Sequence, residues 1–241
     1  MKKNKKNTNL SELVYILDRS GSMSGMGGAA VEAFNQFVEE QQKVEGEAVL
    51  TQVLFDTTFD RPIDARRIEQ VGPMEAADFR PGGCTALLDA IGSSIKATRK
   101  RIKEMPQEQQ PATVVFAIFT DGLENSSQKY TWEKVAKKIK KRTEKDDWQF
   151  LFLAANQDAI ATAAKMNIGR ANSANLAYSK AGISSQGAGF SRRTSAYRRR
   201  SAGLVDKNHE DLVTNLSVIS SQEQKKKEEA EKGSAGSGKK S

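Results

Sequence analysis

The sequence is poor in the side chains that transition-metal sites and many enzymes need. Among its 241 residues, Cys84 is the one cysteine and His209 the one histidine. A single cysteine excludes an intramolecular disulfide, and a zinc site with several His or Cys ligands cannot be built from this chain. A Ser–His–Asp triad or a Cys–His pair would have to use His209. Composition alone therefore excludes many classes of enzyme.

Long hydrophobic runs are also absent. The apolar run that follows the basic N-terminus, residues 13–17, ends at Asp18 and is too short for the core of a signal peptide. No stretch approaches the ~18 apolar residues of a membrane span. With the single cysteine, this predicts a cytoplasmic protein that has no membrane segment.

Acidic residues are outnumbered, with 38 Lys and Arg against 30 Asp and Glu. A net charge of +8 permits contact with nucleic acid without establishing it. Arginines at 192–193 and 198–200 surround Tyr197 and could bind phosphates while the ring stacks on a base. A solvated basic helix is the simpler interpretation of this stretch and of residues 134–142.

Short apolar segments alternate with amphipathic ones. Strands are predicted at 13–17, 48–55, 112–119, 148–154 and 174–178, with a turn at 56–60 into a short edge strand. Helices are predicted at 30–38, 86–95, 131–143 and 160–166, a partial helix at 191–220, and a loop at 62–81. This alternation predicts an α/β, doubly wound, Rossmann-like fold. Its central sheet would be mostly parallel, with one short antiparallel edge strand and helices on both faces.

The composition changes along the chain and predicts four regions. Residues 222–241 are almost entirely Lys, Glu, Gly and Ser, which cannot bury enough apolar surface to offset the entropy of ordering. We therefore expect a flexible basic arm at 1–10, one domain at 11–200, a helical extension at 201–221 and a disordered tail at 222–241.

Polar side chains follow the predicted strands at the edge where parallel sheets bind ligands. Asp18 ends the first strand, and Ser20 and Ser22 follow at two-residue steps, so the three can face one point from an extended loop. Thr85 stands at the entry to a predicted helix, and Asp121 follows the most strand-like segment. These five side chains are the candidate site.

All five side chains offer oxygen, which suits Mg²⁺, Mn²⁺ or Ca²⁺ rather than zinc. We expect Mg²⁺, with Mn²⁺ as the alternative and Ca²⁺ less favoured. Two carboxylates roughly neutralise a divalent ion, and Mg²⁺ keeps waters where protein ligands are missing. An exposed ion of this kind can exchange a water for a carboxylate of another molecule. The predicted partner is a protein that presents Asp or Glu to the metal.

Simpler interpretations exist for each of these residues. The 18–22 motif could be a helix N-cap or a turn, and Thr85 could cap the helix that begins near residue 86. We interpret Asp158, after the fifth strand, as an N-cap rather than a ligand. Cys84 is interpreted as a small packing residue rather than a reactive thiol.

Three segments resemble the metal-ion-dependent adhesion site of von Willebrand factor type A domains. They are Asp18-Arg-Ser-Gly-Ser22, Thr85 after two glycines, and Thr120-Asp121-Gly122, and their order and spacing match as well. The resemblance covers roughly residues 11–200. The segments at 83–91 and 119–127 look particularly like those of small intracellular bacterial and phage members.

This resemblance implies that Ser20, Ser22 and Thr85 ligate the metal directly or nearly so. It implies that Asp18 and Asp121 act directly or through water. The resemblance favours a non-catalytic, metal-dependent protein-binding module. Members of this kind often accompany AAA+ ATPases, kinases or phosphatases.

Two other functions are compatible with the residues. A metal-assisted phosphohydrolase would need a general base near the ion, for which Asp56, Glu124 and Asp158 are the candidates. A nucleic-acid-binding protein would use the basic C-terminal face and the tail, with weak contacts through the basic patches.

Overall fold

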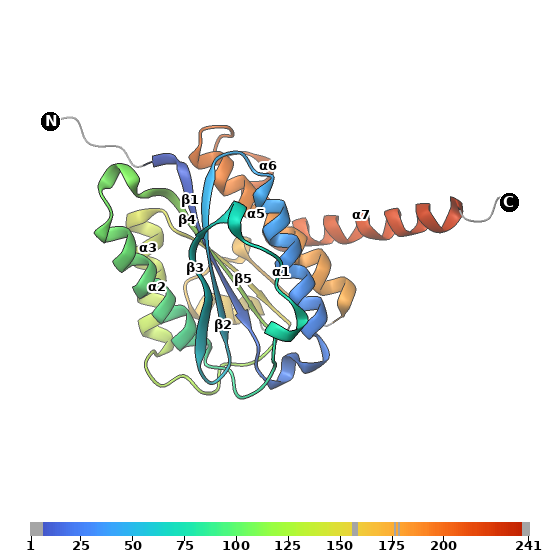
Figure 1. The fold of residues 1–241 in the computed structure, drawn as a ribbon, viewed down its shortest axis with the longest axis horizontal. Coiled ribbons are helices and arrows are strands. Elements are labelled where there is room, and N and C mark those ends of the chain that lie inside the picture. Colours follow the sequence, from blue (N-terminus) through green and yellow to red (C-terminus); the bar gives the residue numbers. More distant parts are fainter. Residues whose placement is uncertain (1–6, 156–158, 176, 178, 238–241) are drawn as a thin grey trace.

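The computed structural model describes residues 7–155, 159–175, 177 and 179–237, which form one sheet with helices on both faces (Figure 1). The strands are β1 (Asn7–Asp18), β2 (Glu47–Phe55), β3 (Phe59–Arg67), β4 (Pro111–Thr120), β5 (Gln149–Ala154) and β6 (Ser173–Asn175). The α-helices are α1 (Gly27–Gln42), α2 (Leu87–Glu104), α3 (Trp132–Asp146), α4 (Ala159–Lys165), α5 (Lys180–Ser201), α6 (Glu210–Val213) and α7 (Leu216–Ser237).

The strand order is β3-β2-β1-β4-β5-β6. All neighbouring strands are parallel except β2 and β3, which pair antiparallel. The predicted fold class is therefore confirmed. The chain first builds outward from β1 to β2 and β3, and then crosses to β4 on the other side of β1. This reversal creates a crevice at the carboxyl ends of β1 and β4, where doubly wound sheets bind their ligands.

The central strand β1 is buried on both faces because helices cover the sheet on each side. Leu13, Tyr15 and Leu17 pack in the core formed with α1 and α5. Val14 and Ile16 pack in the opposite core, formed with α2, α3 and α4. Alternate residues of the apolar run thus serve different cores, as expected of a strand covered on both faces.

Two strand boundaries differ from the sequence prediction. β1 already begins at Asn7, which pairs with Pro111 of β4, so residues 7–10 belong to the sheet rather than to a flexible arm. β3 is longer than the short strand predicted and extends to Arg67, through part of the predicted loop. Its buried Ile63 faces the core, and Pro62 is tolerated because an edge strand pairs on one side only.

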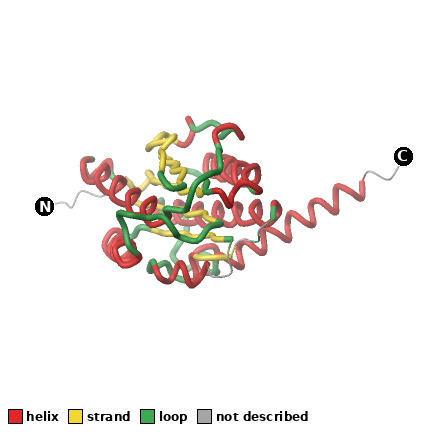
Figure 2. Tube along the Cα trace, turned by 90° about the horizontal axis from the view of Figure 1, so that it is seen from below, coloured by secondary structure: helices red, strands yellow, loops and turns green. Residues whose placement is uncertain are grey.

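The C-terminal region also differs from its prediction. α7 continues without a break to Ser237, where disorder was expected from residue 222, and it projects away from the sheet (Figures 1 and 2). Lys, Glu and Ala are strong helix formers, and Glu223 pairs with Lys226 one turn later, so a helix can form here without a core. No helix in the described ranges is both long enough and apolar enough to cross a membrane.

Arg198 of α5 is a buried structural residue. It is 1% exposed, and its guanidinium donates to the carbonyl oxygen of Gln41 at 2.5 Å and to that of Gly46 at 2.9 Å. These carbonyls lie at and just beyond the C-terminal end of α1, where backbone acceptors lack helical partners. Arg198 therefore satisfies the end of α1 and fastens it to α5.

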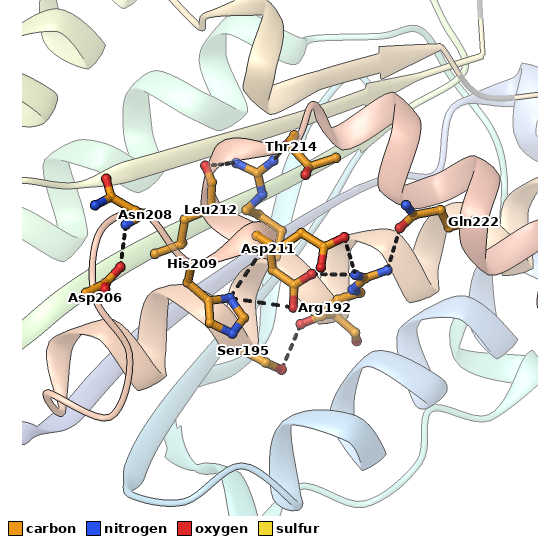
Figure 3. Close-up of polar contacts among 12 residues, drawn as sticks. Arg192, Ser195, Asp206, Asn208, His209, Asp211, Leu212, Thr214 and Gln222 are labelled. Atoms are coloured by element: carbon orange, nitrogen blue, oxygen red, sulfur yellow. Dashed lines mark hydrogen bonds and ion pairs between the residues drawn. The ribbon is translucent and has the colours of Figure 1, made fainter.

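The neighbouring arginines are engaged in the same way. Arg193, 1% exposed, donates to Asn172 Oδ1 at 3.0 Å and to the carbonyl of Leu212 at 3.1 Å. Arg192 pairs with Asp211 at 2.6 Å and donates to Gln222 at 2.8 Å (Figure 3). Arg192 and Arg193 thus hold the C-terminal helices together, and Arg198 joins α5 to α1. The stretch is neither a solvated basic face nor a row of arginines open to phosphates.

Replacing Arg198 by methionine is expected to lower the free energy of unfolding by about 2–4 kcal/mol, because buried carbonyls lose their donor. The matched control is Arg199→Met on the exposed neighbour, with an expected change of less than about 0.5 kcal/mol. Urea unfolding of the two variants measures the difference. Equal effects would contradict the role given to Arg198.

Candidate metal centre

The candidate site lies at the crevice between β1 and β4. Asp18 is the last residue of β1, and Asp121 directly follows β4. Leu17 pairs with Phe119, so Thr120 lies beside Asp18 and its Oγ1 donates to Asp18 Oδ2 at 2.5 Å. The Asp18 side chain is thereby held at the sheet edge, although it is fully buried.

Three loops form the site: the first follows β1 (residues 19–26), the second precedes α2 (residues 81–86) and the third follows β4 (residues 121–131). Hydrogen bonds connect Asp18, Ser20 and Ser22 to Asp121. Asp18 Oδ1 accepts the Ser20 N–H at 2.7 Å, and the hydroxyl oxygens of Ser20 and Ser22 are 3.1 Å apart. Ser22 Oγ donates to Asp121 Oδ1 at 2.7 Å. Ser20 precedes the short 3-10 helix at 21–25, but its side chain makes no capping hydrogen bond. Asp18 therefore does form a local turn through the Ser20 N–H, which was one alternative interpretation of the motif. Ser20 is not a helix cap, which was the other.

Thr85 is not the cap of α2. The N-cap is Ala86, and the first free N–H groups of the helix are satisfied from the third loop. The Leu88 N–H donates to Glu124 Oε2 at 2.9 Å, and the Asp89 N–H donates to Ser127 Oγ at 3.0 Å. The alternative interpretation of Thr85 as a helix cap is therefore wrong.

Gly122 explains how Thr85 approaches Asp18. A β-carbon at position 122 would lie 2.6 Å from Thr85 Oγ1 and 3.5 Å from Asp18 Oδ2. The first distance is too short for a real contact, so only glycine lets the second and third loops close over Asp18. Thr85 itself is 3% exposed.

Backbone contacts fix the three loops relative to one another. The Gly21 N–H donates to the carbonyl of Gly83 at 3.1 Å, and Gly83 adopts a φ of +68°, which favours glycine. Thr85 N–H donates to Asn125 Oδ1 at 2.9 Å, while Asn125 N–H donates to the Thr85 carbonyl at 3.1 Å. The five candidate side chains are therefore held by a preformed frame.

The two carboxylates of the site lie close together in a partly buried place. Burial raises the pKa of Asp18, against the lowering effect of its hydrogen bonds. Burial also raises the pKa of Asp121, and the nearby charge of Asp18 adds to this effect. The cationic Arg19 does not compensate them, because it pairs with Asp56 at 2.9 Å and Asp60 at 2.5 Å.

The donor set fits a hard divalent cation. It consists of two carboxylates and three hydroxyls, and a cation between them would offset the repulsion of the two negative charges. In the described part of the chain, no group of three or more His, Cys, Asp and Glu side chains converges. An ion held here would thus have few charged protein ligands. The direct or water-mediated role of each residue stays a prediction.

Some functional contacts were not foreseen from the sequence. Thr120 belongs to the sequence motif, but its role as the donor that holds Asp18 follows only from the strand register. No pattern in the sequence indicates that Asn125 binds the Thr85 backbone. Cys84 is exposed rather than packed, so its interpretation as a packing residue is wrong. Asp158 lies outside the described residues.

Comparison with known proteins identifies the fold. No protein-family model and no curated protein matches the sequence. A solved von Willebrand factor type A protein from Catenulispora acidiphila is similar with a TM-score of 0.50 and 14% identity over 83% of this chain. The fold is that of a von Willebrand factor type A domain.

Other solved structures share this type A fold at low identity. The proximal thread matrix protein 1 of the mussel byssus has a TM-score of 0.51 and 12% identity over 78% of the chain. A mutant of the PilB minor pilin from Streptococcus sanguinis has a TM-score of 0.54 and 8% identity over 86%. The matched regions are 43%, 46% and 65% of the three proteins, so this chain spans less than two thirds of each.

Gly122→Ala is expected to weaken divalent-metal binding and to cost about 1–3 kcal/mol of stability, because its β-carbon would push Thr85 away from Asp18. Gly82→Ala is the matched control, since a β-carbon there meets nothing within 4 Å. Calorimetric titration of Mn²⁺ into both variants, with thermal unfolding, checks this. Unchanged metal binding in Gly122→Ala would contradict the placement of Thr85 in the site.

Proposed function

We propose that this type A domain is a non-catalytic, metal-dependent protein-binding module. Asp18, Ser20, Ser22, Thr85 and Asp121 would hold one divalent cation, Mg²⁺ or Mn²⁺. A carboxylate of a partner protein would complete its coordination. The observation that carries the proposal is the set of oxygen donors of Asp18, Ser20, Ser22 and Asp121, joined by hydrogen bonds at the crevice between β1 and β4, with Thr85 Oγ1 packed beside them against Gly122.

The charge of the donor set supports recognition rather than permanent caging of the ion. Two carboxylates balance a divalent charge, whereas the three hydroxyls add none. Mg²⁺ prefers octahedral coordination and retains waters where the protein offers no ligand. When bound, the cation supplies an exchangeable position for an anionic oxygen. The protein residues contribute by presenting their oxygens in a fixed arrangement, because the loops are joined through their backbones.

The rim of the site supports a protein partner. Leu123 is 63% exposed and follows Asp121 by two residues. A partner that places an acidic side chain at the ion would bring neighbouring apolar groups onto Leu123 and bury it. Such a small apolar contact beside a charged anchor is typical of protein interfaces.

Two of the three candidate bases for hydrolysis, Asp56 and Glu124, are already engaged, and the third, Asp158, lies outside the described residues. Asp56 pairs with Arg19 and accepts the Thr58 N–H at 2.7 Å. Glu124 accepts N–H groups with both of its oxygens, from Leu88 at 2.9 Å and from Ser127 at 2.8 Å. A general base must reach the water it activates, and these carboxylates are committed to the loop frame. The described residues thus favour binding over phosphate hydrolysis.

The experiment is a titration with Mn²⁺ followed by water-proton relaxation, which reports both metal binding and the waters left on the ion. The wild type is expected to bind Mn²⁺ with high relaxivity. A short peptide that contains one Glu should lower this relaxivity, whereas the same peptide with Gln should not. Asp121→Asn should weaken Mn²⁺ binding by at least about tenfold.

Asp206→Asn is the control, because Asp206 is exposed and follows α5, whose last turns contact Gly46 just before the start of β2, at the opposite end of the strands from the site. It should bind Mn²⁺ as the wild type does. Equal binding by Asp121→Asn would disprove the site. Mn²⁺ binding without any response to the Glu peptide would retain the metal but refute recognition through a carboxylate.

A further inference from the structure

A basic groove lies between α2 and α3. These two helices cover the sheet face opposite α1 and α5 (Figure 1). Its hollow has a volume of about 400 Å³ and is lined mainly by cations: Lys96, Arg99, Lys134, Lys137, Lys138, Lys141 and Arg142. A second hollow of about 220 Å³ shares Arg99 and Arg142 with the first and adds Lys103. Together they form one groove along the two helices.

The cations form a row on each helix. Residues 134, 137, 138 and 141 of α3 recur at three- and four-residue steps and therefore share one face. At 1.5 Å per residue, this row extends for about 10 Å. The buried residues Val135 and Ile139 anchor the adjacent face in the core. Residues 96, 99 and 103 form the facing row on α2, so the two rows flank the groove.

Acidic residues do not balance these charges. No acidic side chain lines the first hollow. Among its described cations, Arg142 forms an ion pair, with Asp146 of the second hollow. Partial burial lowers the pKa of Lys138, and the charges of Lys96 and Arg99 lower it further. The lysines thus repel one another, which an anion in the groove would relieve.

We propose that the α2–α3 groove binds the phosphodiester backbone of a single-stranded nucleic acid, without regard to sequence. A groove with a row of cations on each wall fits an extended ligand whose negative charges repeat along its length. Tyr130 also lines the groove: its ring packs closely against Gly92 of α2 and lies under the ammonium of Lys138 at 5.3 Å, so it forms part of the groove wall.

A membrane surface fits this groove less well. Membrane-binding faces combine basic side chains with exposed apolar ones that enter the lipid. The large exposed apolar side chains of the described residues lie elsewhere, at Leu123, Leu204, Val213 and Val218. The basic site is also a hollow between helices, which favours a strand that can enter it.

The test is fluorescence anisotropy with a labelled oligothymidylate of about 20 nucleotides over a range of salt concentrations. The groove variant carries Lys134→Gln, Lys137→Gln and Lys141→Gln. The matched control carries Lys100→Gln, Lys140→Gln and Lys145→Gln, which removes equal charge from α2 and α3 outside the hollows. Thermal unfolding verifies that both variants are folded.

We expect the groove variant to lose at least about tenfold in affinity near 0.1 M salt, and the slope of log affinity against log salt to fall by about 2. The control should lose less than about threefold. The same losses in both variants, or no wild-type binding at low salt, would overturn the proposal. Equally groove-dependent binding to vesicles of anionic lipid would also overturn it, because the occupant would then be a membrane.

This binding should not depend on the divalent-metal site. EDTA and Asp121→Asn should leave the affinity for the oligonucleotide unchanged. If both abolish it, the groove is not an independent site and the inference fails. The proposed metal-dependent function is judged separately by the Mn²⁺ titration.

Discussion

Asp18 ends the central strand with a carboxylate that is fully buried, and the loops around the site are arranged to satisfy it. A buried carboxylate is costly unless it is hydrogen-bonded or paired with a cation. One of its oxygens accepts the Ser20 N–H and the other accepts the Thr120 hydroxyl. These two bonds join the loop after β1 to the end of β4. The position of Asp121 and its link to Ser22 follow from this junction.

A second set of contacts fixes α2 against the third loop. Glu124 and Ser127 accept the first N–H groups of α2, and Asp89 in the first turn of α2 accepts N–H groups from residues 128–130. The helix start and the loop therefore satisfy each other, and Thr85 does not serve as the cap. The same helix carries part of the basic groove. A single scaffold thus presents two surfaces of opposite charge, an acidic site at the sheet edge and a basic groove on one face.

The sequence allowed the sheet, its central strands and the grouping of the site residues to be predicted, because apolar runs that end in Asp mark buried parallel strands. The sequence could not show that Arg193 and Arg198 are buried. A charged side chain can be buried only where surrounding carbonyl oxygens accept its hydrogen bonds, and these acceptors are known only from the fold. The extension of β3 to Arg67 was not predicted, because an edge strand with one buried face shows only a weak alternation of apolar and polar residues. The helix through residue 237 was not predicted, because the low apolar content of this segment indicates disorder, whereas its Lys, Glu and Ala residues favour a helix even without burial.

The central claim is that five oxygen-bearing side chains at this crevice hold one divalent cation. Anomalous diffraction from crystals soaked in Mn²⁺ would test it most directly. The account predicts one strong peak among Asp18, Ser20, Ser22, Thr85 and Asp121, at about 2.2 Å from the oxygens that ligate it directly. A fully occupied Mn²⁺ elsewhere on the domain, with Ser22 still donating to Asp121 in an ion-free crevice, would contradict it.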